Sequence, residues 1–402
     1  MIAEIVSIGT ELLLGEIVDT NAAHIARRLT AIGVDHYYSS TVGDNEDRIV
    51  HVLRTALGRS DVLITTGGLG PTVDDVTRQA VARAADTELV SSPELLTQIE
   101  THFHSRGYSM TENNRRQALI PLGAIPVENP VGTAPAFIVE TGDKAIICLP
   151  GVPREMVYLL QERVLPYLRQ RMGQDAVILS RWVHTVAIGE GAVDQAIPDL
   201  MRWGNPTVGT RAHPGQTDVC ITAKAGTREK AIGMLDAMEA EVRSRLGVVV
   251  YGVDDETLAG VVASALEHRG LSLAVADTVT EGAIAGRLRA EGPARILAAA
   301  RSAHTSNDLV QELSLGLLTD AEMVSGIASA LRGAVSADLG LAVVSVGGDE
   351  PRVVAALATP GGLCERGWPS RGPSDYAAEW NVHLALDLLR RWLISADEIG
   401  PE

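Results

Sequence analysis

The sequence predicts a mixed α/β protein of three domains, the first of which is doubly wound. Two observations support this prediction. The chain has 402 residues, which is too long for one average domain. Between residues 2 and 156, short β-rich runs alternate with helical patterns, as they do in parallel sheets covered by helices on both faces. The later patterns differ and indicate a small α+β domain followed by another α/β domain.

The first domain is expected to contain four strands, each followed by a helix. The predicted strands are Ile2–Ile8, Asp35–Thr41, Val62–Thr65 and Lys144–Leu149. The predicted helices are one that ends at Leu29, with Thr20 or Asn21 as its N-cap, then Asn45–Leu57, one that includes Val76–Val81, and one that opens within residues 150–156. In such a domain, ligands bind at the carboxyl ends of the strands.

The remaining two domains have their own patterns. Residues 181–250 are expected to form the α+β domain, with strands Trp182–Ile188 and Asp218–Ala223 and the helix Thr227–Leu246. Residues 254–257 begin the third domain, with buried strands Leu271–Ala276 and Leu341–Val346, a Gly/Pro-rich loop Gly361–Pro373 and an amphipathic helix Asp375–Leu393. We therefore expect domain boundaries at 1–172, 176–252 and 254–396.

Composition excludes several classes of function. A net charge of −17 disfavours non-specific binding to nucleic acid or to an anionic membrane. The N-terminus lacks a signal-peptide pattern, and no long uncharged apolar run suggests a membrane span. Cys148, Cys220 and Cys364 are few, odd in number and far apart, which suits a reducing compartment. We expect a cytoplasmic protein.

The most informative segment is the glycine-rich turn of residues 65–75, between the third strand and its helix. Gly67, Gly68 and Gly70 allow backbone N–H groups to approach an anion closely. We expect Pro71 at the first helical position, and Asp74 and Asp75 in the first turn. Two carboxylates repel a bare phosphate, so the segment predicts a site for a metal-bound phosphate or pyrophosphate. The alternative is a tight turn whose acids complement the helix dipole.

Seven motifs, in order, now allow a comparison with a known family. They are Gly9–Gly15, Asp19–Asn21, Thr41–Asn45, Gly67–Asp75, Met110–Arg115, Asn129–Pro135 and Pro150–Met156. Together they closely resemble the competence/damage-inducible protein A (CinA) family, and seven ordered matches make a chance similarity very improbable. The resemblance extends over the whole chain, but unevenly.

The resemblance implies a molybdopterin-binding-like first domain with metal-dependent ADP-ribose pyrophosphatase activity, which yields AMP and ribose 5-phosphate. It implies a KH-like second domain. This chain lacks the basic Gly-x-x-Gly loop and is acidic, so a spacer or dimerisation role is favoured over RNA binding. The third domain would be a nicotinamide mononucleotide deamidase, linked to nicotinamide nucleotide metabolism. We expect a homodimer that takes a small-molecule dinucleotide substrate.

For pyrophosphate cleavage, Asp74 and Asp75 are the expected ligands of a divalent metal ion such as Mg, Mn or Co. Glu11, Asp75 and Arg78 are the expected catalytic residues. Glu11 acts as a metal ligand or general base, or instead caps its turn. Arg78 neutralises phosphate, or instead pairs with Asp74 or Asp75. The expected substrate-binding residues are Gly9, Thr10, Asn21, Asp44, Gly67, Gly68, Gly70, Thr72, Asn129, Gly132, Thr133, Gly151 and Glu155.

Several of these residues also have simpler structural roles. Asn21 is favoured slightly as a helix cap over a ligand contact. Asp44 contacts a ribose or forms an Asx-turn. The loop of residues 129–135 closes over a nucleotide or only turns the chain. Glu155 complements a helix dipole first and binds metal second.

The third domain departs from its family at the residues that carry the chemistry. Active members have an Ala-Glu-Ser-x-Thr-Gly-Gly segment with a serine nucleophile, whereas this chain has Asp277 and Thr278. The family's downstream lysine base is missing, and no lysine follows Lys230. Val344 replaces a hydrogen-bonding threonine. We expect a retained fold and a lost deamidase site. Deamidase activity or a non-catalytic nucleotide- or molybdopterin-binding scaffold are the alternatives.

Overall fold

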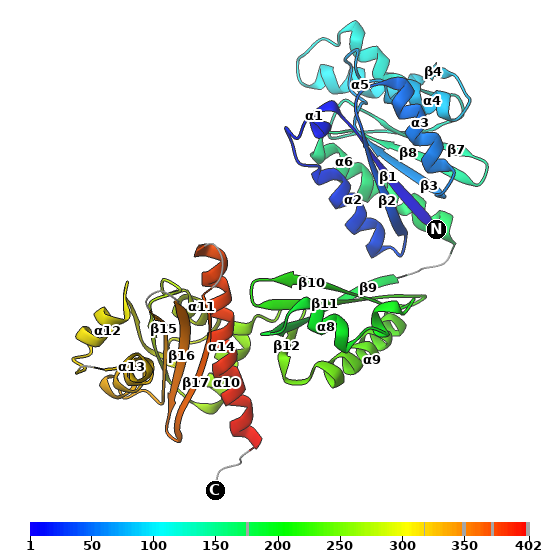
Figure 1. Ribbon diagram of the computed structural model, residues 1–402. Coiled ribbons are helices and arrows are strands. Elements are labelled where there is room, and N and C mark those ends of the chain that lie inside the picture. The colour runs from blue at the N-terminus through cyan, green and yellow to red at the C-terminus, as the bar shows by residue number, and fades with distance from the viewer. Residues whose placement is uncertain (174–176, 317, 348–350, 371–373, 399–402) are drawn as a thin grey trace. The chain divides into compact units, whose positions relative to one another are not determined.

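The computed structural model describes residues 1–173, 177–316, 318–347, 351–370 and 374–398 (Figure 1). The chain divides into two compact units, each described here by itself. The first unit is residues 1–179 with 224–232, and the second is residues 180–223 with 233–402.

The first unit contains a six-stranded sheet. Its strands are β1 (Ile2–Ile8), β2 (Asp35–Val42), β3 (Val62–Thr66), β6 (Ile125–Val127), β7 (Ala136–Thr141) and β8 (Lys144–Leu149). The strand order is β2-β1-β3-β8-β7-β6. The first four strands in this order are parallel, and β7 and β6 are antiparallel additions at one edge. The expected strands Ile2–Ile8 and Lys144–Leu149 are confirmed.

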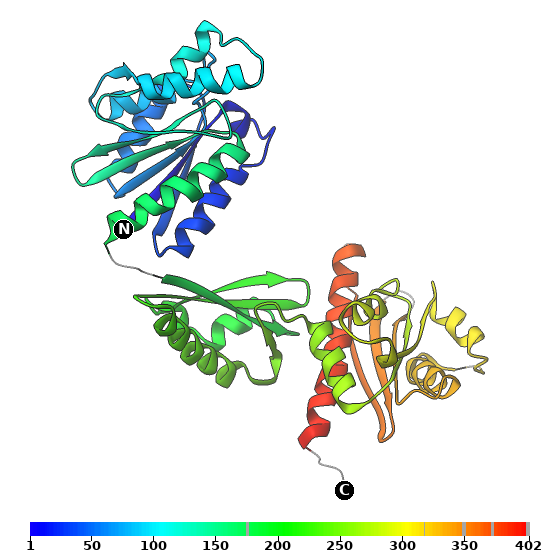
Figure 2. The same cartoon turned by 180° about the vertical axis from the view of Figure 1, so that it is seen from behind.

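Helices cover both faces of this sheet, as Figures 1 and 2 show from opposite sides. The helices are α1 (Thr10–Leu13), α2 (Thr20–Ala31), α3 (Glu46–Leu57), α4 (Thr77–Ala84), α5 (Pro93–Ser105), α6 (Pro153–Leu159) and α7 (Leu165–Met172). On β3, Leu63 packs in a core with α3, α4 and α5, whereas Val62 and Ile64 pack in a second core with α2, α6 and α7. Alternate residues of one strand thus serve opposite cores, which confirms the doubly wound fold.

The remaining elements of the first unit lie beside the main sheet. A short pair, β4 (Leu89–Ser91) and β5 (Leu119–Pro121), forms a separate two-stranded sheet. A 3-10 helix spans Glu112–Ala118, and a π-helical turn spans Leu160–Val164 between α6 and α7. These elements, together with α5, β6 and β7, were not expected from the sequence.

The second unit begins with a four-stranded sheet in the order β10-β11-β9-β12. Its elements are β9 (Val177–Val186), β10 (Thr207–His213), β11 (Gln216–Ala225) and β12 (Val250–Val253), with α8 (Glu190–Ala196) and α9 (Arg228–Leu246). The end of β11 and the start of α9 belong to the first unit by their contacts. The expected α+β character is confirmed, although β10 and β12 were not expected.

The rest of the second unit is a five-stranded sheet in the order β14-β13-β15-β16-β17. The strands are β13 (Leu273–Asp277), β14 (Leu297–Ser302), β15 (Leu339–Val346), β16 (Arg352–Thr359) and β17 (Gly362–Pro369). The helices are α10 (Leu258–Arg269), α11 (Ala283–Glu291), α12 (Ser306–Glu312), α13 (Asp320–Ala334) and α14 (Ser374–Glu398).

One prediction for this sheet is wrong. The Gly/Pro-rich stretch Gly361–Pro373 is not simply a loop, because Gly362–Pro369 forms the edge strand β17 and pairs antiparallel with β16. An edge strand needs partners on one side only, so it tolerates glycine and a terminal proline. Residues 371–373 lie outside the described part of the chain.

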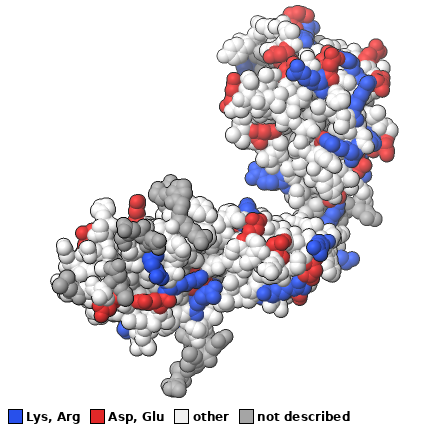
Figure 3. Space-filling model, viewed as in Figure 1, with Lys and Arg blue, Asp and Glu red and all other residues white. Residues whose placement is uncertain are grey.

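Charged side chains of both signs are interspersed on the face seen in Figure 3. Among the described helices, none is both long enough and apolar enough to cross a membrane.

Candidate functional site

A cavity of about 460 Å3 lies at the carboxyl ends of β1, β3 and β8 in the first unit. This is the position where doubly wound domains bind ligands. The cavity gathers most of the residues expected from the sequence: Gly9, Glu11, Asn21, Asp44, Gly67, Gly68, Gly70, Asp74, Asp75, Thr133, Gly151 and Glu155. Thr10, Thr72, Arg78, Asn129 and Gly132 do not line it, but each is close to a residue that does.

The glycine-rich loop forms one wall, and its shape depends on glycine at two positions. Gly67 has φ 109°, and a Cβ there would lie 2.0 Å from the carbonyl oxygen of Ile8. Gly68 has φ 63°, and a Cβ there would lie 2.1 Å from Thr77 Oγ1. The backbone N–H groups of Gly68, Leu69 and Gly70 have no acceptor among the described residues. The loop therefore leaves backbone donors without partners, as anion-binding loops do.

The acids of this loop precede the helix. α4 begins at Thr77 with Val76 as its N-cap, so Pro71, Asp74 and Asp75 lie in the preceding turns and not in the first helical turn. This corrects the expected placement. Asp75 Oδ2 accepts hydrogen bonds from the backbone N–H of Thr72, at 2.8 Å, and from the Thr72 hydroxyl. This local Asx-type turn takes the place of helix capping. Asp74 is exposed.

Arg78 lies under the loop and not in the cavity. Its side chain is 3% exposed, and its guanidinium donates to the carbonyl oxygens of Leu69, at 2.6 Å, and Gly70, at 3.3 Å. No ion pair joins it to Asp74 or Asp75 among the described contacts. Burial lowers its pKa to about 10. This placement differs from the expected direct contact with phosphate: Arg78 supports the loop that would contact it.

The turn after β1 forms a second wall. Thr10 donates to Asp44 Oδ2 through its backbone N–H and its hydroxyl, both at 2.8 Å, and so joins this turn to the end of β2. Asn45, and not Asp44, caps α3. Glu11 is exposed at the cavity and its carboxylate has no hydrogen-bond partner among the described residues. Glu11 is thus free to contact a ligand or accept a proton.

Asn21 differs from its favoured role as a helix cap. α2 is capped by Asp19, which accepts from the backbone N–H of Ala22 at 2.9 Å. Asn21 Nδ2 donates instead to Thr66 Oγ1, at 3.0 Å, and to the carbonyl oxygen of Gly151, at 2.8 Å. Its Oδ1 is buried without a partner. Asn21 therefore joins the ends of β3 and β8 and keeps one acceptor unused beside the cavity.

The loop of residues 129–135 holds Glu155 in place. The Asn129 side chain is fully buried, and its Nδ2 donates to Glu155 Oε2 at 2.5 Å and to the carbonyl oxygen of Ala134 at 2.9 Å. A Cβ at Gly132 would collide with the Glu155 carboxyl group. Burial raises the pKa of Glu155, although the bond from Asn129 acts in the opposite direction. Thr133 thus reaches the cavity from a loop that Asn129 shapes, and Glu155 reaches it from the first turn of α6, held by that loop.

The charge of the cavity bears on the expected metal. Six carboxylates line it, from Glu11, Asp19, Asp44, Asp74, Asp75 and Glu155, whereas its lining residues include no lysine, arginine or histidine. Within the described residues, no three His, Cys, Asp or Glu side chains are grouped so that they alone hold a metal ion. An oxygen-only donor set with one or two free carboxylates fits a hard divalent ion that also binds ligand phosphates. In the glycine loop, the oxygen donors open to such an ion are the exposed Asp74 carboxylate, whose pKa is lowered by a hydrogen bond from Thr72, and Asp75 Oδ1.

In the third domain, the segment that was expected to have lost its deamidase residues forms a well-defined turn. Asp277 accepts hydrogen bonds from the backbone N–H groups of Val279, Thr280 and Gly282, at 2.8 to 2.9 Å. Thr278 Oγ1 accepts from the N–H of Ser345 at 3.3 Å, and Val344 is fully buried. Asp277 therefore shapes the turn before α11. Part of the compared family segment, Gly348 and Asp349, lies outside the described residues.

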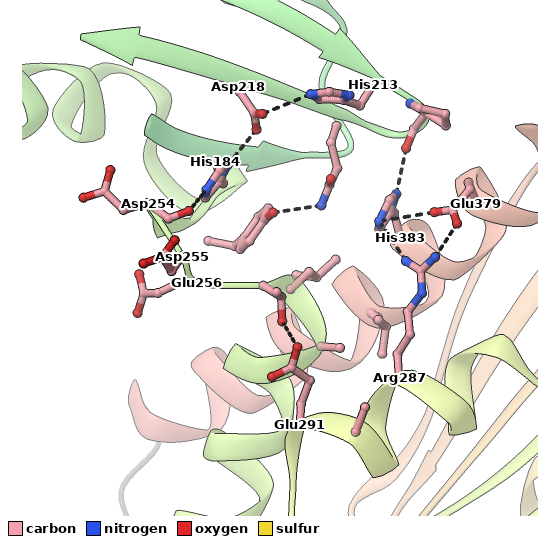
Figure 4. A pocket seen from close by; sticks show the side chains of 18 residues that line it. His184, His213, Asp218, Asp254, Asp255, Glu256, Arg287, Glu291, Glu379 and His383 are labelled. Carbon is pink, nitrogen blue, oxygen red and sulfur yellow. Dashed lines mark hydrogen bonds and ion pairs between the residues drawn. The ribbon is translucent and has the colours of Figure 1, made fainter. Parts of the chain in front are cut away.

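Sequence reasoning missed a second cavity, of about 590 Å3, within the second unit (Figure 4). Ionisable side chains from β9, β11, α11 and α14 converge on it, among them His184, Asp218, Arg287 and His383. His184 Nδ1 lies 2.7 Å from Asp218 Oδ1, and its Nε2 lies 2.8 Å from the carbonyl oxygen of Asp254. These residues come from segments far apart in the sequence, so only the tertiary structure reveals the group.

Comparison with known proteins places the chain in a family. Residues 4–170 match the family described as "Probable molybdopterin binding domain", and residues 180–252 match "Damage-inducible protein CinA KH domain". A "Putative competence-damage inducible protein" of Halothermothrix orenii is 39% identical over 87% of this chain and 86% of its own length. One of Alkaliphilus metalliredigens is 36% identical over 98% of this chain and all of its own length.

Among solved structures, "the protein CinA with unknown function from Thermoplasma acidophilum" is 38% identical, with a TM-score of 0.39 over 41% of this chain and 96% of that chain. The sequence matches to the two relatives extend over most of both chains, and the resemblance in the ordered motifs is confirmed. The chain belongs to the competence/damage-inducible protein A (CinA) family.

Proposed function

We propose that the first-unit cavity hydrolyses ADP-ribose to AMP and ribose 5-phosphate with the help of a divalent metal ion. The observation that supports the proposal most strongly is that backbone N–H groups without acceptors and several carboxylates line the same cavity. The N–H groups of Gly68, Leu69 and Gly70 suit phosphate oxygens, whereas the surrounding carboxylates repel them. A divalent cation held by these carboxylates would offset that repulsion.

The residues at the cavity would have different roles in this reaction. The glycine loop orients the pyrophosphate, and Arg78 keeps that loop in shape from below. Asp74 and Asp75 would hold the metal, which when bound neutralises phosphate charge and lowers the pKa of water. Water adds to one phosphorus, the bridging P–O bond breaks, and Glu11 accepts the proton that the water loses. Glu11 suits this step because it lines the cavity and its carboxylate has no hydrogen-bond partner among the described residues.

The same reasoning assigns no chemistry to the third domain. Thr278 has a hydroxyl, but no lysine follows Lys230 to act as the expected base, and Val344 offers no hydrogen bond. The proposal therefore places the hydrolase activity in the first unit, and no amidase activity in the second.

Glu11 gives the sharpest test, because a matched control lies in the loop that follows its helix α1. Glu16 is also exposed but does not line the cavity. With ADP-ribose and Mg or Mn, we expect Glu11→Gln to lower kcat by a factor of about 10² to 10⁴. Glu16→Gln should stay within twofold of the unchanged protein. Equal activity of the two variants, with AMP release measured by chromatography, would remove Glu11 from the mechanism.

A second candidate function is binding of a molybdopterin-type ligand in the same cavity. The description of the family that matches residues 4–170 favours it. A pterin phosphate would use the same glycine loop, because such a loop recognises the phosphate and not the rest of the molecule. Fluorescence of a pterin released from the purified, denatured protein would support this candidate.

A further inference from the structure

The 3-10 helix Glu112–Ala118 lies against the glycine loop of the first unit. Ala118 and Leu69 belong to the same buried core. The buried side chain of Gln117 donates to the carbonyl oxygen of Leu69 at 3.4 Å. Asn114, which is also buried, donates through Nδ2 to Gln117 Oε1 at 3.1 Å and so holds Gln117 in place. The 3-10 helix is therefore placed so that its side chains reach the carbonyl oxygens of the loop.

Arg116 extends this contact to the turn that carries the two acids. Its Nη1 donates to the carbonyl oxygen of Thr72 at 3.1 Å. The same carbonyl oxygen accepts from the backbone N–H of Asp75 at 3.3 Å, while the N–H and the hydroxyl of Thr72 donate to Asp75 Oδ2. A hydrogen bond from Thr72 also holds the pKa of Asp74 below its usual value. Thr72 thus joins Arg116 to both acids.

The partners of Arg116 differ from those of its neighbour Arg115. Arg115 forms ion pairs with Glu112, at 3.2 Å, and with Glu100, at 3.9 Å. Arg116 is partly buried and has no carboxylate partner among the described residues, although acidic side chains outnumber basic ones in this chain. The rigid, planar donor group of an arginine fixes the acceptor that it contacts. The described contact of Arg116 is therefore suited to fixing the backbone of the turn.

Arg78 and Arg116 hold different parts of the same loop. Arg78 donates to the carbonyl oxygens of Leu69 and Gly70, and Arg116 donates to that of Thr72. Burial lowers the pKa of Arg78 to about 10, and the nearby charge of Arg116 acts in the same direction. Because a peptide unit is planar, fixing its carbonyl oxygen fixes the orientation of the whole unit. The two arginines together therefore set the path of the loop up to its acids.

We propose that Arg116 is a positioning residue for the metal ion: by fixing the Thr72 carbonyl oxygen, it holds the turn in the shape that presents Asp74 and Asp75 to the ion. This inference rests on the proposed function, in which these two acids hold a divalent cation. A role of Arg116 as a mere positive charge beside the site has the opposite sign, because removal of a nearby positive charge strengthens cation binding. The direction of the change in metal affinity therefore separates the two roles.

The test measures binding of Mn²⁺ alone to the full chain by electron paramagnetic resonance, which distinguishes free from bound ion. Asp74→Asn defines the part of the binding that belongs to this site, since an acidic chain also binds cations elsewhere. Arg116→Met removes the donor but keeps a long side chain, and Arg116→Lys keeps a charged donor. The matched control is Arg115→Met, because Arg115 lies in the same 3-10 helix and its described ion pairs are with Glu100 and Glu112.

We expect Arg116→Met to raise the dissociation constant of this site for Mn²⁺ by about tenfold, as the loss of a residue that orients a metal ligand commonly does. Arg116→Lys should stay within about threefold of the unchanged protein, because its ammonium group still donates to a carbonyl oxygen. Arg115→Met should match the unchanged protein. With ADP-ribose, the Mn²⁺ concentration for half-maximal rate should rise in Arg116→Met, while kcat at saturating Mn²⁺ stays within about threefold, which a general loss of folding would not allow.

The outcomes separate this inference from the proposed function. An unchanged or lower dissociation constant for Mn²⁺ in Arg116→Met overturns the positioning role, and so does the absence of Asp74-dependent binding in the unchanged protein. Mn²⁺ binding that depends on both Asp74 and Arg116, without cleavage of ADP-ribose, supports the positioning role and overturns the hydrolase. Cleavage with the same metal dependence in Arg116→Met and Arg115→Met keeps the hydrolase and overturns the positioning role.

Discussion

Asp75 has two roles that compete for one carboxylate. Its Oδ2 closes the turn through Thr72, so only Oδ1 remains for a metal ion. Asp74, which is exposed and adjacent, supplies the other expected metal donor. The two carboxylates are therefore not equivalent: Asp75 Oδ2 closes the turn, whereas Asp74 is exposed and a hydrogen bond from Thr72 holds its pKa below the usual value.

This division leads to a prediction for Asp75→Asn. The amide oxygen of asparagine still accepts the two bonds from Thr72, so the turn and the thermal midpoint should be kept. The metal-binding charge is lost, so turnover of ADP-ribose should fall by a factor of at least 10², and higher Mn concentration should restore part of it. Metal titrations of initial rate measure this. Wild-type activity at every metal concentration would rule out Asp75 as a ligand.

Residue roles that depend on distant partners could not be predicted from the sequence. Asn21 follows Asp19 and Thr20, all of which are good N-caps, and nothing local shows that its true partners are Thr66 and Gly151. Arg78 looked like a neighbour of Asp75, but the loop folds back so that its carbonyl oxygens meet the guanidinium. The sequence did predict that Glu11, Asp44 and Gly67 would lie near one another, because each follows a strand and the carboxyl ends of parallel strands meet at one edge of the sheet.

At the scale of elements, His184 links β9 to the segment that enters α10. Both of its ring nitrogens face acceptors, Asp218 Oδ1 and the carbonyl oxygen of Asp254, so both must carry a proton. The hydrogen bond to Asp218 raises the pKa of His184, while partial burial opposes this. His213 and Arg211 also face Asp218, and the Tyr251 ring stacks on the imidazole. Asp254 itself has a positive φ of 52°.

The sign of the resulting pH dependence follows from the raised pKa. The stabilisation is complete below the unfolded-state pKa of about 6.5 and is lost as pH rises through the higher folded-state value. We expect an NMR titration of the His184 ring to have a midpoint above that of a free histidine, and Asp218→Asn to lower this midpoint. A midpoint at or below the ordinary value in the intact protein would contradict the doubly protonated ring.

Elements with strong local signals were predictable to the residue. Ile2–Ile8 and Lys144–Leu149 are apolar runs with clear boundaries, and both strands match. The start of α4 was misplaced because Pro71, Asp74 and Asp75 mimic a helix N-terminus, whereas Thr72 satisfies Asp75 locally. β17 was missed because glycine and proline are poor strand formers except at an edge, and edge position is decided by the rest of the sheet.

For the whole molecule, we predict a homodimer. Closed two-fold assemblies are the commonest among soluble oligomers, and the third domain keeps an apolar core without an assigned activity. Light scattering coupled to gel filtration should give about 85 kDa, twice the 42.5 kDa of one chain. A mass near that of one chain at micromolar concentration would contradict the dimer.

The central claim is that one cavity in the first unit carries a metal-dependent pyrophosphate hydrolysis. The most direct measurement is product analysis of ADP-ribose after incubation with the chelator-treated full chain, alone and with Mg, Mn or Co. The account predicts AMP and ribose 5-phosphate in equal amounts with at least one metal, and intact ADP-ribose without metal. Intact ADP-ribose with all three metals, or equal cleavage with and without them, would contradict it.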